Sequence, residues 1–329
     1  MPRIIVARIP AFTLVEILAA TAILSVMFTI MFGILQQTSI GWQAANRKVE
    51  ASQAARLALE QIASDLENCF TFQATNLTVP GTNTARSYAF GFVSSNSYPV
   101  SGLQRGAEFT DGNSALFVVT PRSPSLSTGG GDLVETGYVP IYISSPTNIT
   151  GIRRGRYALL RHFPLTNTST NVFDYRPITF FWRFPGDWET RTELRYGGTN
   201  PPNFNAIVDN CVRFSLRFIY VNTSGRVMTT PDGRWGRPQT NGAWGPASHP
   251  PDAPNSLPLA AEITMAVLDD RTAERLYVVN SNRVLTAQQI TNISPSNPTL
   301  QGFPNETVRR TLLGGMTMLQ RVVYFKAQP

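Results

Sequence analysis

The sequence has little cysteine, little histidine and little charge. Its 329 residues include two cysteines, Cys69 and Cys211, and two histidines. Two cysteines are too few for a disulfide-dense scaffold, although they suffice for one bridge in an oxidising compartment. Charged residues make up 15% of the chain, and the net charge of +7 is spread without any run of lysine or arginine. We therefore expect no basic arm that binds nucleic acid.

The chain also lacks the residue patterns of common enzyme sites. His162 and His249 stand in no spacing that binds a metal with a second histidine, cysteine or glutamate. No Gly-x-Ser-x-Gly motif occurs, and the glycine-rich stretch at 127–132 lacks the lysine of a phosphate-binding loop. Asp269 and Asp270 are adjacent, and neighbours on a strand point to opposite faces, so we interpret them as a strand end or a helix cap. We predict no cofactor, no metal site and no enzymatic activity.

Two further features of the sequence are compatible with a binding role but do not establish one. Residues 176–196, RPITFFWRFPGDWETRTELRY, mix aromatic and basic side chains as surfaces for single-stranded nucleic acid do. A strand pair with one buried face explains that stretch better. Some carboxylates could hold calcium, but no spacing of oxygen ligands singles a site out among Asp132, Asp187 and Asp252.

The most informative feature that is present is an apolar run near the N-terminus. Ile17 to Leu35 comprises nineteen residues without an ionisable group, which is about the length that a helix needs to cross a bilayer. The run is longer than the apolar core of a secretory signal peptide, which has about 7–15 residues. Glu16 directly precedes the run, and a carboxylate at the edge of lipid is costly, so it indicates a function.

We predict one helix from about Thr13 to about Asn68, because good helix formers fill this stretch and no proline interrupts it. Residues 12–35 would form its membrane half, and residues 36–70 its amphipathic half. In the second half an apolar stripe recurs at helical spacing, with Ala55, Leu59, Ile62 and Leu66. The opposite face carries Arg56, Glu60, Gln61, Asp65 and Glu67.

Residues 71–329 have the pattern of a β-rich domain. Short apolar runs alternate with clusters of Gly, Pro, Ser, Asn and Asp, which is typical of an antiparallel sheet domain. We therefore predict an α+β fold, in which the long N-terminal helix packs on an antiparallel β-sheet domain. A short helix is predicted at 270–279. The predicted strands are 87–93, 114–120, 136–143, 156–163, 178–184, 211–221, 259–268 and 320–325.

The clearest alternation lies in the strand at 211–221, CVRFSLRFIYV. It predicts one apolar face with Val212, Phe214, Leu216 and Phe218, and one polar face with Arg213, Ser215 and Arg217.

The N-terminal residues resemble the class III signal of type IV pilins and of type II secretion pseudopilins. A short leader with Arg3 and Arg8 precedes AFTLVEILAA, and Phe-Thr-Leu-x-Glu opens the long helix. This resemblance implies that residues 1–11 are a leader, that a prepilin peptidase cuts between Ala11 and Phe12, and that it methylates the new Phe12 amine. Ala11 stands where those families usually have glycine.

The resemblance also gives Glu16 a role in assembly. Glu16 lies four residues after Phe12, about one helical turn away. Glu16 of one subunit could neutralise the Phe12 amine of a neighbour inside an apolar helix bundle, since pairing makes a buried charge tolerable. The alternative is a plain membrane anchor whose glutamate reaches the lipid headgroups.

Residues 12–270 resemble the minor pseudopilin J family of type II secretion systems at low identity, because the strand pair 136–143 and 156–163 is similar to that family's. The segment LDDRTAERL at 268–276 also looks like the pilin-like Verru_Chthon cassette protein C group. The last sixty residues have no counterpart in these families.

The resemblance implies a minor pilin or pseudopilin, a non-enzymatic subunit of tip type, since a bulky domain obstructs tight stacking. Its partners would be other pilin-like subunits, a prepilin peptidase and the inner membrane, with the C-terminal domain periplasmic. Trp235 and Trp244, in a long loop, could contact a neighbouring subunit or a secreted substrate. The alternatives are a pilus minor pilin serving adhesion or DNA uptake, and a membrane-anchored extracytoplasmic binding protein or hydrolase.

Cys69 and Cys211 form a candidate disulfide. Cys69 closes the predicted helix and Cys211 opens the strand at 211–221, so a helix that packs on the sheet could bring them within disulfide range. The bridge would close a long loop and stabilise the fold by about 4–5 kcal/mol. Two buried, unbonded thiols are the alternative.

Overall fold

The computed structural model describes only part of the chain, namely residues 13–69, 73–78, 85–89, 92–95, 107–110, 112–121, 133–143, 155–162, 204–230, 258–280 and 284–326. The chain divides into two compact units, Met1–Val49 and Glu50–Pro329. Several sequence features lie outside the described residues: the leader, the predicted strand 178–184 with the aromatic-basic stretch around it, the loop with Trp235 and Trp244, His249, Asp132, Asp187 and Asp252.

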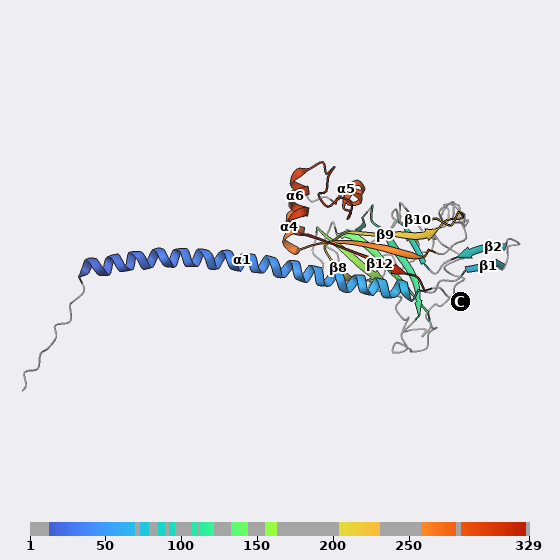
Figure 1. Cartoon of the computed structure of the whole chain (residues 1–329), viewed down its shortest axis with the longest axis horizontal. Coiled ribbons are helices and arrows are strands. Elements are labelled where there is room, and N and C mark those ends of the chain that lie inside the picture. Colours follow the sequence, from blue (N-terminus) through green and yellow to red (C-terminus); the bar gives the residue numbers. More distant parts are fainter. Residues whose placement is uncertain are drawn as a thin grey trace, which may run out of the picture. The chain divides into compact units, whose positions relative to one another are not determined.

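Helix α1 spans Leu14–Glu67, 54 residues, within one residue of the predicted ends (Figure 1). Hydroxyl groups in its apolar part donate to the carbonyl oxygens one turn earlier. The Ser25 hydroxyl donates to Thr21 at 2.8 Å, and the Thr29 hydroxyl donates to Ser25 at 2.8 Å. Such bonds satisfy polar side chains within the helix, as an apolar surrounding requires.

The strands among the described residues form a two-stranded ribbon, a four-stranded sheet and a six-stranded sheet, all antiparallel. The predicted α+β class is therefore confirmed, with two larger sheets where the sequence indicated one sheet domain. The ribbon pairs β1 (Gln73–Thr78) with β2 (Ala85–Ala89). The four-stranded sheet has the order β10 (Val227–Thr229), β9 (Cys211–Val221), β11 (Ala260–Leu268) and β12 (Met316–Tyr324). The six-stranded sheet has the order β3 (Phe92–Ser95), β5 (Ala115–Pro121), β6 (Leu133–Ile143), β7 (Arg156–His162) and β8 (Phe204–Asp209), and β4 (Ala107–Phe109) pairs with β6.

Most predicted strands are confirmed, and β9 coincides with the predicted 211–221. The predicted run at 87–93 is wrong as one strand, because the structure divides it between β2 and β3. The predicted 320–325 is only the end of β12, which begins at Met316 directly after a helix.

The core of the second unit forms where the last turns of α1 meet the sheets. The predicted stripe is confirmed, since Ala55, Leu59, Ile62 and Leu66 are all buried. They share one apolar cluster with β9 and β11 and with side chains from β5, β6, β7 and β8. Each large apolar side chain buried in this way contributes about 1.5–3 kcal/mol.

A bulge in β9 corrects one prediction. Arg213 pairs with Ala266 and Cys211 pairs with Val267, which leaves Val212 as an extra residue between the two pairs. The extra residue exchanges the two sides of the strand. Cys211 therefore joins the cluster around α1, while Val212 packs with Ala266 in a second cluster. The prediction that Val212 shares the face of the strand's phenylalanines is wrong, and it is confirmed for Phe214, Leu216 and Phe218.

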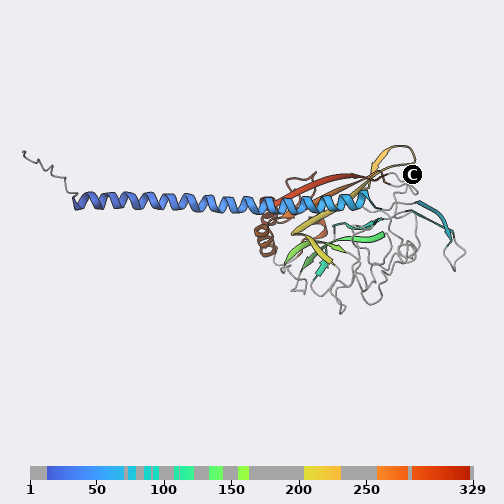
Figure 2. The same ribbon diagram turned by 90° about the horizontal axis from the view of Figure 1, so that it is seen from below.

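Three short helices complete the second cluster: α4 (Asp270–Val279), α5 (Ala287–Asn292) and α6 (Glu306–Gly315). Figures 1 and 2 show them gathered at one end of the four-stranded sheet. The Asp269 carboxylate accepts from the backbone N–H of Thr272 at 2.9 Å and so caps α4. This confirms the predicted helix at 270–279 and the interpretation of the aspartate pair as a helix cap.

Candidate functional site: the N-terminal helix and its attachment to the sheets

The first part of α1 carries large apolar side chains that no other described residue covers. Leu14 is 76% exposed, and Ile23 and Phe32 are each 64% exposed. The helix is long and apolar enough to cross a membrane, with a mean hydropathy of 2.3 in its most apolar window. Contiguous apolar surface of this extent is typical of segments that contact lipid or other proteins.

Thr13 and Glu16 form a capping box at the start of this helix. The Thr13 backbone N–H and hydroxyl both donate to Glu16 Oε2 at 2.9 Å, and the Glu16 N–H donates to the Thr13 hydroxyl at 3.3 Å. Sequence reasoning passed over Thr13, although Thr-x-x-Glu before an apolar run is the signal of such a box. Glu16 Oε1 accepts no hydrogen bond from the described residues, so one carboxylate oxygen is left for another partner.

Ala11 and Phe12, the residues of the predicted cleavage site, lie outside the described residues. The described chain begins at Thr13, and the first helical residue is Leu14. Cleavage and methylation at these positions stay predictions.

The far end of α1 is attached to the six-stranded sheet by a polar cluster. Asp65 Oδ2 lies 2.7 Å from Arg161 Nη2 on β7, and the Tyr138 hydroxyl on β6 donates to the same oxygen. Tyr138 and Arg161 are paired across the two strands. Burial, together with the nearby Asp65 charge, raises the pKa of Tyr138 well above its usual range. The cluster holds the helix end in one position on the sheet.

Asp65 therefore departs from its predicted place on the solvent-facing side of the helix. Its side chain is 15% exposed, whereas Glu60 on the same helix is exposed. Helical spacing places Asp65 about 140° around the helix from Glu60 and about 180° from Arg56, on the flank of the apolar stripe. The difference arises because the six-stranded sheet flanks this side of the helix end and supplies a cation and a phenol there.

Cys69 and Cys211 lie in the same apolar cluster, as buried free thiols. The bulge at Val212 turns Cys211 toward that cluster. Burial is the main cause that raises the pKa of each thiol to about 12. They lie at different places in that cluster: Lys326, just after the end of β12, donates to Asn68 at 3.0 Å, whereas Cys211 pairs with Val267, which pairs with Thr317 near the start of β12. The expected proximity of helix end and strand start is therefore not seen, and the disulfide stays a prediction.

Among the described residues, no group of three histidine, cysteine, aspartate or glutamate side chains gathers in a way that could hold a metal ion. His162 is the last residue of β7.

No protein-family model and no curated protein matches this chain. Among solved structures, the chain is similar to the type IV-like pilin TTHA1219 from Thermus thermophilus, with 10% sequence identity and a TM-score of 0.28. The match covers 83% of this chain and 96% of that chain. A TM-score this low supports no conclusion about fold or function.

Proposed function

We propose that this chain is a pilin-like subunit that works by assembly. The supporting observation is that the two parts of α1 have different surroundings. Its first part is apolar and uncovered, and its last turns belong to the core of a separate folded unit. A helix built in this way can place its apolar part in lipid, or among the helices of other subunits, while the folded unit stays in water.

The proposal includes processing of the N-terminus. A prepilin peptidase removes residues 1–11 by cutting between Ala11 and Phe12, and Phe12 then carries a methylated amine. The resemblance of Phe-Thr-Leu-x-Glu to the class III signal supports this step, as does the start of α1 two residues after Phe12.

Glu16 has two tasks in this proposal. One oxygen caps the helix through Thr13, and the other accepts the Phe12 amine of a neighbouring subunit. The ion pair lies in an apolar bundle, where an unpaired charge is expensive. Glu16 therefore sets the register between neighbouring helices.

The proposed setting is a type II secretion or type IV pilus-like assembly in the inner membrane, with the second unit periplasmic. The breadth of that unit, two sheets and three short helices beside the end of α1, supports a position at a filament tip. The partners are other pilin-like subunits and the prepilin peptidase, with a secreted substrate as a third candidate.

Cross-linking between pilin-like subunits in membranes tests the role of Glu16. Glu16→Gln keeps a side chain that completes a capping box but removes the charge. We expect this variant to insert normally and to cross-link about tenfold less, as loss of a buried ion pair implies. Thr13→Val weakens the cap and keeps the charge, so its cross-linking should stay close to that of the unaltered chain.

Thr21→Val is the matched control, because it removes a hydroxyl that is bonded within the same apolar segment. If Glu16→Gln and Thr21→Val cross-link equally well, Glu16 does not pair with a neighbour. That result would favour the alternative of a membrane anchor for an extracytoplasmic binding or hydrolytic domain.

A further inference from the structure

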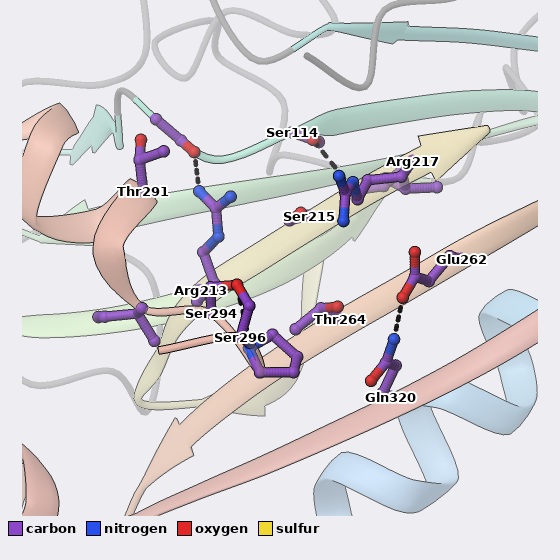
Figure 3. Close-up of a pocket in the computed structure, with 14 residues that line it drawn as sticks. Ser114, Arg213, Ser215, Arg217, Glu262, Thr264, Thr291, Ser294, Ser296 and Gln320 are labelled. Carbon is purple, nitrogen blue, oxygen red and sulfur yellow. Dashed lines mark hydrogen bonds between the residues drawn. The ribbon is translucent and has the colours of Figure 1, made fainter. Parts of the chain in front are cut away.

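A polar cavity of about 350 Å³ lies on the four-stranded sheet, on the face that α1 does not cover. Its floor comes from β9, β11 and β12. Its walls come from the segment that follows α5 and from the turn before β5 (Figure 3). The cavity belongs entirely to the second unit, and it has no part in the proposed assembly through α1.

Strand pairing aligns three uncharged polar side chains across the floor. Ser215 on β9 pairs with Thr264 on β11, and Thr264 pairs with Gln320 on β12. Ser215 is 9% exposed and Thr264 is 5% exposed. Their hydroxyls form no hydrogen bond with any described residue. Both hydroxyl oxygens are open to the cavity, so they can bond water or a ligand there.

Two guanidinium groups flank Ser215 along β9. Arg213 donates to the Gly112 carbonyl oxygen and keeps further N–H groups without a partner among the described residues. Burial lowers the pKa of Arg213 to about 10, which leaves it charged at neutral pH. Arg217 is exposed and lies opposite Glu262 on β11. The Glu262 carboxylate instead accepts from the Gln320 side chain, as Figure 3 shows.

The wall formed by the end of α5 and the segment after it adds hydroxyl groups that are bonded within the chain. The Ser294 and Ser296 hydroxyls are bonded to each other at 2.8 Å, and the Thr291 hydroxyl donates to the Ala287 carbonyl oxygen at 2.7 Å. Each of these hydroxyls can still accept a hydrogen bond from a ligand.

The lining therefore offers two cations, one carboxylate and several hydroxyls. A guanidinium binds a carboxylate through two parallel hydrogen bonds. The uncharged side chains of Ser215, Thr264 and Gln320, together with Glu262, suit a ligand that donates and accepts hydrogen bonds through hydroxyl groups. Glu262 would repel a doubly charged phosphate, whereas it can accept a hydrogen bond from a sugar hydroxyl.

We propose that this cavity binds a small acidic sugar, a hydroxylated ring with one carboxylate. The carboxylate lies between Arg213 and Arg217, and the ring hydroxyls face Ser215, Thr264 and Glu262.

Equilibrium dialysis of the full chain in detergent micelles tests this site, with radiolabelled glucuronate as the probe. We expect saturable binding of glucuronate with a dissociation constant in about the millimolar range. Glucose and acetate should bind at least about tenfold more weakly, because glucose lacks the carboxylate and acetate lacks the ring hydroxyls. Arg217→Gln should weaken glucuronate binding about tenfold or more. Thr264→Val, which keeps the side-chain volume, should weaken it about fivefold.

Arg226→Gln is the control, since Arg226 is exposed in the turn between β9 and β10 and does not line the cavity. Absence of saturable glucuronate binding would overturn the proposal, and so would equal binding by the Arg217 and Arg226 variants. Acetate or inorganic phosphate that competes as well as glucuronate would show a plain anion site and would exclude the sugar. Arg217 is at the surface, so its variant remains informative even if Thr264→Val does not fold.

Discussion

Asp65 near the end of α1 and Arg161 on β7 form an ion pair, with 2.7 Å between Oδ2 and Nη2. Their side chains are only 15% and 12% exposed. Tyr138 donates to the same oxygen, and the Arg161 guanidinium lies 5.7 Å from the centre of the Tyr138 ring. One helical carboxylate thus joins α1 to two neighbouring strands of the six-stranded sheet.

Asp65→Asn should destabilise the second unit by about 3 kcal/mol, because it removes the carboxylate from a largely buried cation and phenol. Urea unfolding of the chain in detergent, followed by circular dichroism, measures this. Glu60→Gln is the matched control on an exposed site of the same helix, and it should shift the free energy of unfolding by less than about 0.5 kcal/mol. Equal effects of the two variants would mean that the cluster does not fix the helix end.

Gly315 and Gly314 are neighbours at the end of α6 that should respond in opposite ways to alanine. A Cβ at Gly315 would lie 1.8 Å from Thr272 Oγ1 and 2.1 Å from Asp269 Oδ2, within the cap of α4. Gly315→Ala should therefore cost about 1–3 kcal/mol. A Cβ at Gly314 meets nothing within 4 Å, so Gly314→Ala should be neutral or stabilise by up to about 1 kcal/mol. Thermal unfolding of both variants decides this, and a tolerated Gly315→Ala would contradict the close contact between α6 and the cap.

The two buried thiols predict a loss of stability in alkali. Each has a pKa of about 12 in the folded chain, against about 8.5 when unfolded. The contribution of the two thiols to the free energy of unfolding is complete below their pKa in the unfolded chain. It is lost as the pH rises from that value toward 12. The expected loss is about 1.4 kcal/mol per pH unit for each thiol. Urea midpoints at several pH values under reducing conditions measure this slope, and replacing both Cys69 and Cys211 by alanine should flatten it. An unchanged slope would mean that the thiols are not buried in solution.

A disulfide between Cys69 and Cys211 stays a prediction from the sequence, and it would require the helix end to move, because Asn68 contacts Lys326 after the end of β12 whereas Cys211 lies beside the start of that strand. Mass spectrometry of non-reduced peptides would show the linked pair if this bridge forms in an oxidising envelope. Full alkylation of both cysteines without reductant, in denatured protein from the envelope, would show instead that packing alone holds the helix end.

Much of the fold could be predicted because its signals are local. The bounds of α1 follow from a run of good helix formers without proline, and the buried stripe from Ala55 to Leu66 follows from helical spacing. The helix at 270–279 follows from its apolar spacing and from Asp269 before it. These features depend on residues within a few positions of one another.

The rest depends on contacts between distant segments. The bulge that turns Val212 away from Phe214 exists only in the register that β9 takes against β11. The place of Asp65 is decided by Tyr138 and Arg161, which lie 73 and 96 residues further along the chain. The cavity on the four-stranded sheet combines three strands with the segment around the end of α5 and the turn before β5, and no sequence spacing brings Ser215, Thr264 and Gln320 together.

The N-terminal residue of the mature chain tests the proposed function most directly. The measurement is intact mass and N-terminal sequencing of the chain from membranes that contain an active prepilin peptidase, with a known prepilin in the same cells as control. The account predicts a chain that begins at Phe12 with one methyl group on its amine, and Ala11→Gly should be cut at least as fast. A chain that still begins at Met1 or Pro2, in cells where the control prepilin is cut, would contradict the proposal.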